Sequence, residues 1–193
     1  MRRVIKSAES KIVERQLVYK ESNNDKLRQL LADEQHSICA YTETYLGPSD
    51  DAHIEHFNPT LKDHVDDGYT NWFLVKGLWN TRKCKKWVNP ILHPTAEDLE
   101  SRILYINGDY EAADPDDIEA NNLIRLLDLD NARLADQRKR YVKLKKQEII
   151  DANKSSQEYV DHLLTNYPEG VYFIRAIEEE LNVNVNFDLL KTT

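Results

Sequence analysis

The sequence is poor in cysteine and glycine, with two and five of these residues among 193. Cys39 and Cys84 cannot form the disulfide framework of a small secreted domain, and so few thiols suit a reducing cytoplasm. Neither a P-loop nor a dinucleotide-binding fingerprint occurs in the chain. These absences exclude a disulfide scaffold and the two common glycine-rich nucleotide sites.

Long apolar runs are also missing. No window approaches the roughly 18 consecutive apolar residues that a membrane helix needs, and no signal peptide is visible at the basic N-terminus. Hydrophobic residues make up 40% and charged residues 31%, which is typical of a soluble, helix-rich protein of one or two domains. We therefore expect a cytoplasmic protein without a membrane partner.

The formal net charge is -8. A chain of this charge is not a general nucleic-acid coat, because non-specific affinity comes mostly from cations that face phosphates. A negative net charge does not exclude a local basic site. The positions of the charge clusters therefore say more about possible partners than the net charge does.

The residue pattern predicts an α+β fold. Residues 8–35 are expected to be helical, and residues 37–45, which are β-branched and aromatic, are expected to form a strand. Asn107-Gly108 predicts a hairpin turn. Long helices are expected over 132–152 and, after Pro168, over 169–181.

The informative segment begins with His53-Ile54-Glu55-His56-Phe57. On a strand, His53 and Glu55 share one face and His56 lies on the other. Alone, this pattern fits a polar edge strand as well as it fits a functional site.

The residues that follow favour a site. Asn71 lies 15 positions after His56 and directly precedes an apolar run, 72–75, that predicts a second strand. Asn80 lies nine positions further on and opens a basic helical run. Four cations of this run, on or near the same helix, are expected to face nucleic acid: Arg82, Lys83, Lys85 and Lys86.

This order of strand, loop, strand and helix resembles the ββα-metal motif of HNH endonucleases. The resemblance implies that Glu55 and Asn80 hold one divalent cation, which His53 reaches directly or through water. It also implies that His56 is the general base and Asn71 its orienting residue, while Lys83 contacts phosphate. Oxygen ligands suit Mg²⁺ or Mn²⁺ better than Zn²⁺.

The chemistry is consistent with that resemblance. Phosphodiester hydrolysis needs an activated water, a positive charge beside the pentacovalent phosphate, and stabilisation of the leaving oxygen. An imidazole with an ordinary pKa of about 6.5 can take a proton at neutral pH.

A narrower resemblance links the chain to the HNH subunit of the Septu anti-phage defence system, which also accompanies some retrons. It rests on Cys39-Ala40-Tyr41-Thr42-Glu43, the His-Ile-Glu-His-Phe run, and Trp79-Asn80-Thr81-Arg82-Lys83. It implies a nuclease that cleaves DNA in a complex with an ABC/SMC-like ATPase. The expected organisation is a small ββα-metal core, 37–93, between an N-terminal helical segment, 1–36, and a mainly helical C-terminal region, 94–193.

The sequence departs from that family at its zinc clamp. Relatives carry two Cys-x-x-Cys pairs, but here Thr42 stands at the position of the partner of Cys39, and Lys76 and Trp79 stand where the second pair would fall. We therefore expect no structural zinc, and we expect tryptophan packing in its place. This loss keeps an alternative open, a catalytically degenerate adaptor that only binds the ATPase. An RNA substrate is a second alternative.

Overall fold

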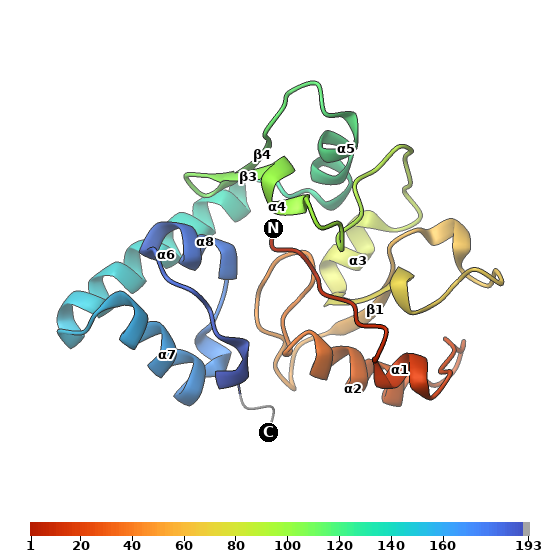
Figure 1. Cartoon of the computed structure of the whole chain (residues 1–193), viewed down its shortest axis with the longest axis horizontal. Coiled ribbons are helices and arrows are strands. Elements are labelled where there is room, and N and C mark those ends of the chain that lie inside the picture. The colour runs from red at the N-terminus through yellow and green to blue at the C-terminus, as the bar shows by residue number, and fades with distance from the viewer. Residues whose placement is uncertain (191–193) are drawn as a thin grey trace.

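The computed structural model describes residues 1–190 and has an α+β architecture, as predicted. Figure 1 shows α1, α2, β1 and α3 on one side of the molecule and α6, α7 and α8 on the other, with the β3–β4 hairpin and α5 between them at the top. The helices are α1 (Lys11–Glu14), α2 (Asp25–Glu34), α3 (Gly77–Lys83), α4 (Leu99–Arg102), α5 (Ile118–Leu127), α6 (Ala132–Ala152), α7 (Ser156–Asn166) and α8 (Ile174–Leu181). The strands are β1 (Ala52–His56), β2 (Trp72–Lys76), β3 (Ile103–Ile106) and β4 (Asp109–Ala112), and short 3-10 turns cover Pro59–Leu61, Tyr69–Asn71, Pro168–Gly170 and Phe187–Leu189.

β1 and β2 form an antiparallel pair that positions the candidate site. Their register places His53 opposite Val75, Glu55 opposite Phe73 and His56 opposite Trp72. All of β2 except Lys76 is buried, because its apolar side chains lie in the larger of two hydrophobic clusters. α3 follows β2 directly and contacts both strands. The chain therefore runs strand, strand, helix through this region.

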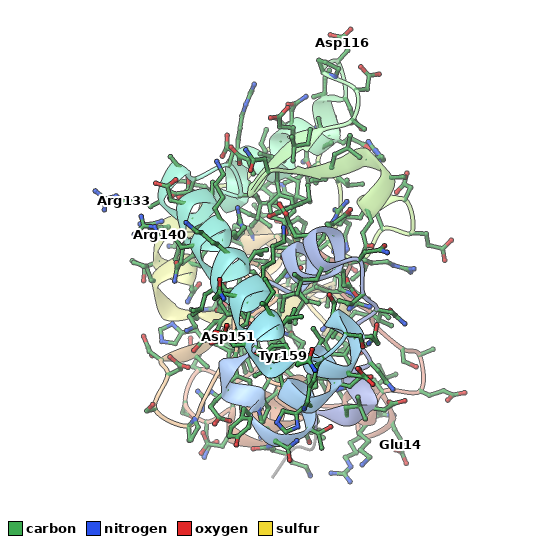
Figure 2. All side chains as sticks on the ribbon, turned by 90° about the vertical axis from the view of Figure 1, so that its left-hand side faces the viewer. Glu14, Asp116, Arg133, Arg140, Asp151 and Tyr159 are labelled. Atoms are coloured by element: carbon green, nitrogen blue, oxygen red, sulfur yellow. The ribbon has the colours of Figure 1, made fainter. Side chains whose placement is uncertain are left out.

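The second cluster lies on the opposite side of the molecule, where α6, α7 and α8 pack against each other. α6 has the predicted bounds, Ala132–Ala152, and Asn131 caps it by accepting from the backbone N–H groups of Arg133 and Leu134. Figure 2 views this helix from the outside, and its Arg133 and Arg140 side chains point away from the protein. The predicted hairpin is also present, and both turn residues have positive φ, +47° at Asn107 and +87° at Gly108.

Two sequence-based predictions of secondary structure are wrong. Residues 37–45 form no strand but a buried loop, closed by the Cys39 N–H to Thr44 O and Glu43 N–H to Cys39 O hydrogen bonds, both 2.9 Å. Their β-branched and aromatic composition reflects burial, which strands and buried loops share. Residues 8–35 contain only α1 and α2, since Gln16 with φ of 47° ends the first helix and an exposed loop follows.

The predicted last helix begins later than expected. Pro168 opens only a 3-10 turn, and α8 starts at Ile174 after Phe173 takes a left-handed conformation. α7 was not predicted, although Ser155 and Glu158 form the reciprocal capping box that signals a helix start. None of the helices within residues 1–190 is long and apolar enough to cross a membrane.

Candidate active site

The face of β1 that carries His53 and Glu55 lies against α3. The Nδ1 atom of His53 is 3.0 Å from Nδ2 of Asn80, and Oε1 of Glu55 is 2.5 Å from Nζ of Lys83. The structure therefore brings together four of the predicted site residues in two pairs. Asn80 lies in the middle of α3 and Lys83 at its end, because this helix begins at Gly77, three residues before the predicted start.

Gly77 allows α3 to approach the start of β1 closely. Its N–H donates to Asp51 O at 2.7 Å, and a Cβ atom here would lie 2.1 Å from Asp51 Oδ2. The Asp51 carboxylate in turn contacts Nε2 of His53 at 2.7 Å. A carboxylate on one ring nitrogen is the usual arrangement of a histidine whose other nitrogen binds a metal. Asp51 was not predicted as part of the site.

Glu55 and Lys83 form a buried ion pair. The two residues are 4% and 2% exposed, and Lys83 Nζ also donates to the backbone carbonyl of His56 at 3.1 Å. Burial raises the pKa of the Glu55 carboxyl, and the nearby ammonium of Lys83 opposes this effect. Oε1 of Glu55 is therefore already in contact with a cation, the Lys83 ammonium.

His56 lies on the other face of β1 and pairs with Asp67. Its Nε2 atom is 3.0 Å from Asp67 Oδ2, and the ring of Tyr19 meets the imidazole edge-on at 4.5 Å. Burial lowers the pKa of His56, and the carboxylate of Asp67 acts in the opposite direction. The imidazole is therefore mainly neutral at pH 7, the state that a general base requires.

Asn71 contacts this pair through Asp67. Its Nδ2 donates to Asp67 Oδ1 at 2.9 Å and to Asn58 O at 3.1 Å, while its Oδ1 accepts from the N–H of Asn58 at 2.7 Å. Asn71 thus ties together the base of the loop between β1 and β2 and fixes the carboxylate that faces His56. Asp67 has no signal in the sequence that marks it as a site residue, because it lies in an irregular loop among other acids.

The predicted metal ligands fit a hard cation in their chemistry. Glu55, His53 and Asn80 offer a carboxylate, an imidazole and an amide on facing elements. His53 and Asn80 also line a cavity of about 160 Å³ with Tyr19 and Arg28. No group of three or more His, Cys, Asp or Glu residues is arranged to hold an ion in the described part of the chain. A cation at Glu55 would have to displace the Lys83 ammonium.

Two of the four zinc-clamp positions, Cys39 and Lys76, are in contact. The backbone N–H of Lys76 donates to the buried Sγ atom of Cys39 at 3.4 Å. Trp79 packs on both hydrophobic clusters.

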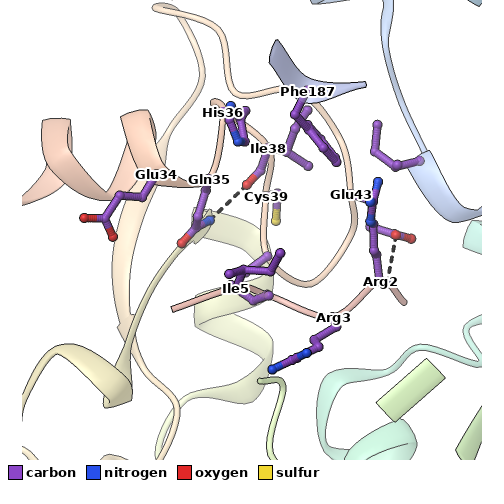
Figure 3. Close-up of a pocket in the computed structure, with 13 residues that line it drawn as sticks. Arg2, Arg3, Ile5, Glu34, Gln35, His36, Ile38, Cys39, Glu43 and Phe187 are labelled. Atoms are coloured by element: carbon purple, nitrogen blue, oxygen red, sulfur yellow. Dashed lines mark hydrogen bonds between the residues drawn. The ribbon is translucent and has the colours of Figure 1, made fainter. Parts of the chain in front are cut away.

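A separate pocket of about 120 Å³ lies beneath the N-terminal segment, and Cys39 and His36 are among its lining residues. Figure 3 shows this pocket, with Gln35 bonded to Ile38 and Arg2 bonded to Glu43. Most of this pocket is apolar, and none of the predicted site residues lines it.

The predicted nucleic-acid contacts differ in exposure. Arg82, Lys85 and Lys86 are exposed, whereas Lys83 is buried. Lys85 and Lys86 follow the end of α3, where Cys84 takes a φ of 50°. The guanidinium of Arg82 lies 4.6 Å above the Trp79 ring and bonds to Asp128 Oδ2 at 3.1 Å.

A scan against protein-family models and searches of curated proteins and of solved structures gave no match.

Proposed function

We propose that the protein is a metal-dependent endonuclease of the HNH class that hydrolyses phosphodiester bonds in DNA. The observation that carries this proposal is the arrangement around β1: His53 and Glu55 face the helix that bears Asn80, and His56, the next residue of the strand, has a carboxylate partner on the opposite face. A neutral base and a set of metal ligands within one small motif are the groups that metal-assisted hydrolysis needs.

Each residue has a role in this proposal. His56 takes the proton of the attacking water, Asp67 holds the imidazole in place, and Asn71 holds Asp67. Mg²⁺ or Mn²⁺, held by Glu55, Asn80 and His53, would supply positive charge to the phosphate and the leaving oxygen. Lys83 neutralises the Glu55 carboxylate in the metal-free protein.

As the biological setting, we propose an anti-phage effector that works with an ABC/SMC-like ATPase. The net charge of -8 supports a nuclease that does not hold DNA alone. This setting rests on the resemblance to Septu nucleases.

One observation favours a second candidate, an adaptor without activity. An ammonium group already neutralises Glu55, as in a site that has lost its metal. A cleavage assay separates the two. Supercoiled plasmid and tRNA are incubated with the protein, with and without the ATPase, in Mg²⁺, Mn²⁺ or EDTA, beside His56→Ala. Nicking that needs metal and His56 supports the nuclease, cleavage of tRNA alone makes RNA the substrate, and no cleavage in any arm supports the adaptor.

A further inference from the structure

A cavity of about 380 Å³ lies between α3 and α5. Among the residues that line it are Tyr41, Trp79, Arg82, Lys86, Arg125 and Asp128, and we call it the α3–α5 pocket. It is separate from the cavity that His53 and Asn80 line on another face of α3. The buried Lys83 also borders the α3–α5 pocket, so this side chain contacts both the pocket and Glu55.

The pocket concentrates positive charge in an acidic protein. Four of its lining residues are cationic, and Asp128 is the one acid among them. Arg82 pairs with Asp128 and Lys83 pairs with Glu55. Lys86 and Arg125 have no carboxylate partner within residues 1–190, and both are exposed. Two free cations at one cavity attract an anion.

Two of the lining residues, Tyr41 and Trp79, also carry a buried polar donor that has no acceptor within residues 1–190. The hydroxyl of Tyr41 and Nε1 of Trp79 are buried and have no hydrogen-bond partner within the described residues. Burial and the nearby Glu55 raise the pKa of Tyr41, so its hydroxyl keeps its proton. Indole, guanidinium and ammonium groups can only donate. A fitting ligand is therefore anionic and rich in acceptor oxygens.

We propose that the α3–α5 pocket binds a phosphate group, carried either by a mononucleotide or by the end of a nucleic-acid strand. Guanidinium groups bind phosphate oxygens with good geometry. Pockets for small molecules begin at about 300 Å³, so this cavity has room for more than a bare phosphate. The proposal does not depend on cleavage, because binding is measured without a divalent metal.

The test is calorimetric titration of the full chain in EDTA and physiological salt. The probes are inorganic phosphate, a nucleoside 5′-monophosphate, the matching nucleoside, and a short single strand with and without a 5′-phosphate. We expect the monophosphate to bind roughly tenfold or more tightly than the nucleoside. A strand that binds tightly only with its terminal phosphate, and more tightly than the mononucleotide, identifies a strand end. Equal affinities of the 5′-phosphorylated strand and the nucleoside monophosphate identify the mononucleotide as the ligand.

Variants locate the site. Arg125→Gln and Tyr41→Phe should each weaken phosphate binding, the first by roughly tenfold. Arg133→Gln, an exposed arginine on α6 outside the pocket, is the matched control and should bind as the parent does. Absence of binding by every phosphate-bearing probe would overturn the proposal, and so would equal losses in Arg125→Gln and Arg133→Gln. Failure of the nuclease assay would leave this result unchanged.

Discussion

The Nζ atom of Lys83 lies 2.5 Å from Oε1 of Glu55, and both side chains are almost fully buried. A divalent cation at Glu55 must therefore compete with an ammonium group that is already in contact with the carboxylate. Removal of the Lys83 ammonium should therefore change the affinity for a divalent cation. This change can be measured without a substrate.

Lys83→Met should destabilise the metal-free protein by about 3 kcal/mol, because it leaves Glu55 buried without a counter-charge. Saturating Mn²⁺ should restore part of this loss, and the melting temperature of the variant should rise more with Mn²⁺ than that of the parent. Scanning calorimetry measures both effects. The Glu55→Gln, Lys83→Met double variant is the control and should not respond to Mn²⁺; equal metal responses in all three proteins would argue against Glu55 as a ligand.

Asp67→Asn should lower the rate of cleavage by about 10-fold to 100-fold, because the carboxylate orients His56 and raises its basicity. The KM for substrate should change little, and the acidic limb of the pH–rate profile should move to lower pH. Asp66→Asn, at an exposed acid that contacts His64, is the control. If both variants cleave at the parent rate, the assignment of His56 and its carboxylate is wrong.

Stability should fall as the pH drops from 7 to 5, and His93 should contribute to the fall. Burial, and to a smaller extent Lys6, lower the pKa of His93 in the folded protein. The unfolded chain, with an ordinary pKa of about 6.5, then binds more protons than the folded one in this range. His93 stabilisation is thus present above pH 6.5 and is lost toward the folded pKa.

Urea unfolding at several pH values tests this expectation. His93→Gln should flatten the dependence of the unfolding free energy by at most about 1.4 kcal/mol per pH unit. The parent protein, measured in the same buffers, serves as the comparison. An unchanged slope in His93→Gln would show that this imidazole does not titrate differently on folding.

Gly77→Ala should destabilise the protein by about 1–3 kcal/mol, since the new Cβ atom would overlap the Asp51 carboxylate. It should also release His53 from Asp51, which the NMR chemical shifts of the His53 ring at one fixed pH can follow. Gly68→Ala is the control, because nothing lies within 4 Å of its Cβ position. Combining Gly77→Ala with Asp51→Ala should recover part of the loss; no recovery would place the strain elsewhere in α3.

The sequence predicted those parts of the fold that have a strong local signal. The strand around His53 and Glu55, the Asn107-Gly108 hairpin and the bounds of α6 follow from periodicity and turn chemistry. The loop at 37–45 did not, because its apolar residues are buried by tertiary contacts rather than by strand pairing.

The candidate site was also predictable only in part. The resemblance to the ββα-metal motif placed His53 and Asn80 on facing elements, but it could not show that Lys83 turns inward to Glu55 or that Asp67 reaches His56. Those contacts depend on how α3 docks and how an irregular loop closes. Neither the docking of α3 nor the closing of this loop is encoded by a periodic pattern in the sequence.

The buried Glu43 has a consequence for how the molecule unfolds. Its carboxylate accepts hydrogen bonds from the N–H of Arg2, the hydroxyl of Tyr110 and the N–H of Arg175, three segments far apart in the chain. A loop in the first half of the sequence thereby holds together both hydrophobic clusters. If any one of these segments detached, the buried carboxylate of Glu43 would lose one of its three hydrogen-bond donors. The two clusters should therefore unfold in a single cooperative transition. A fragment that starts at residue 94 would lack this carboxylate and should not fold alone.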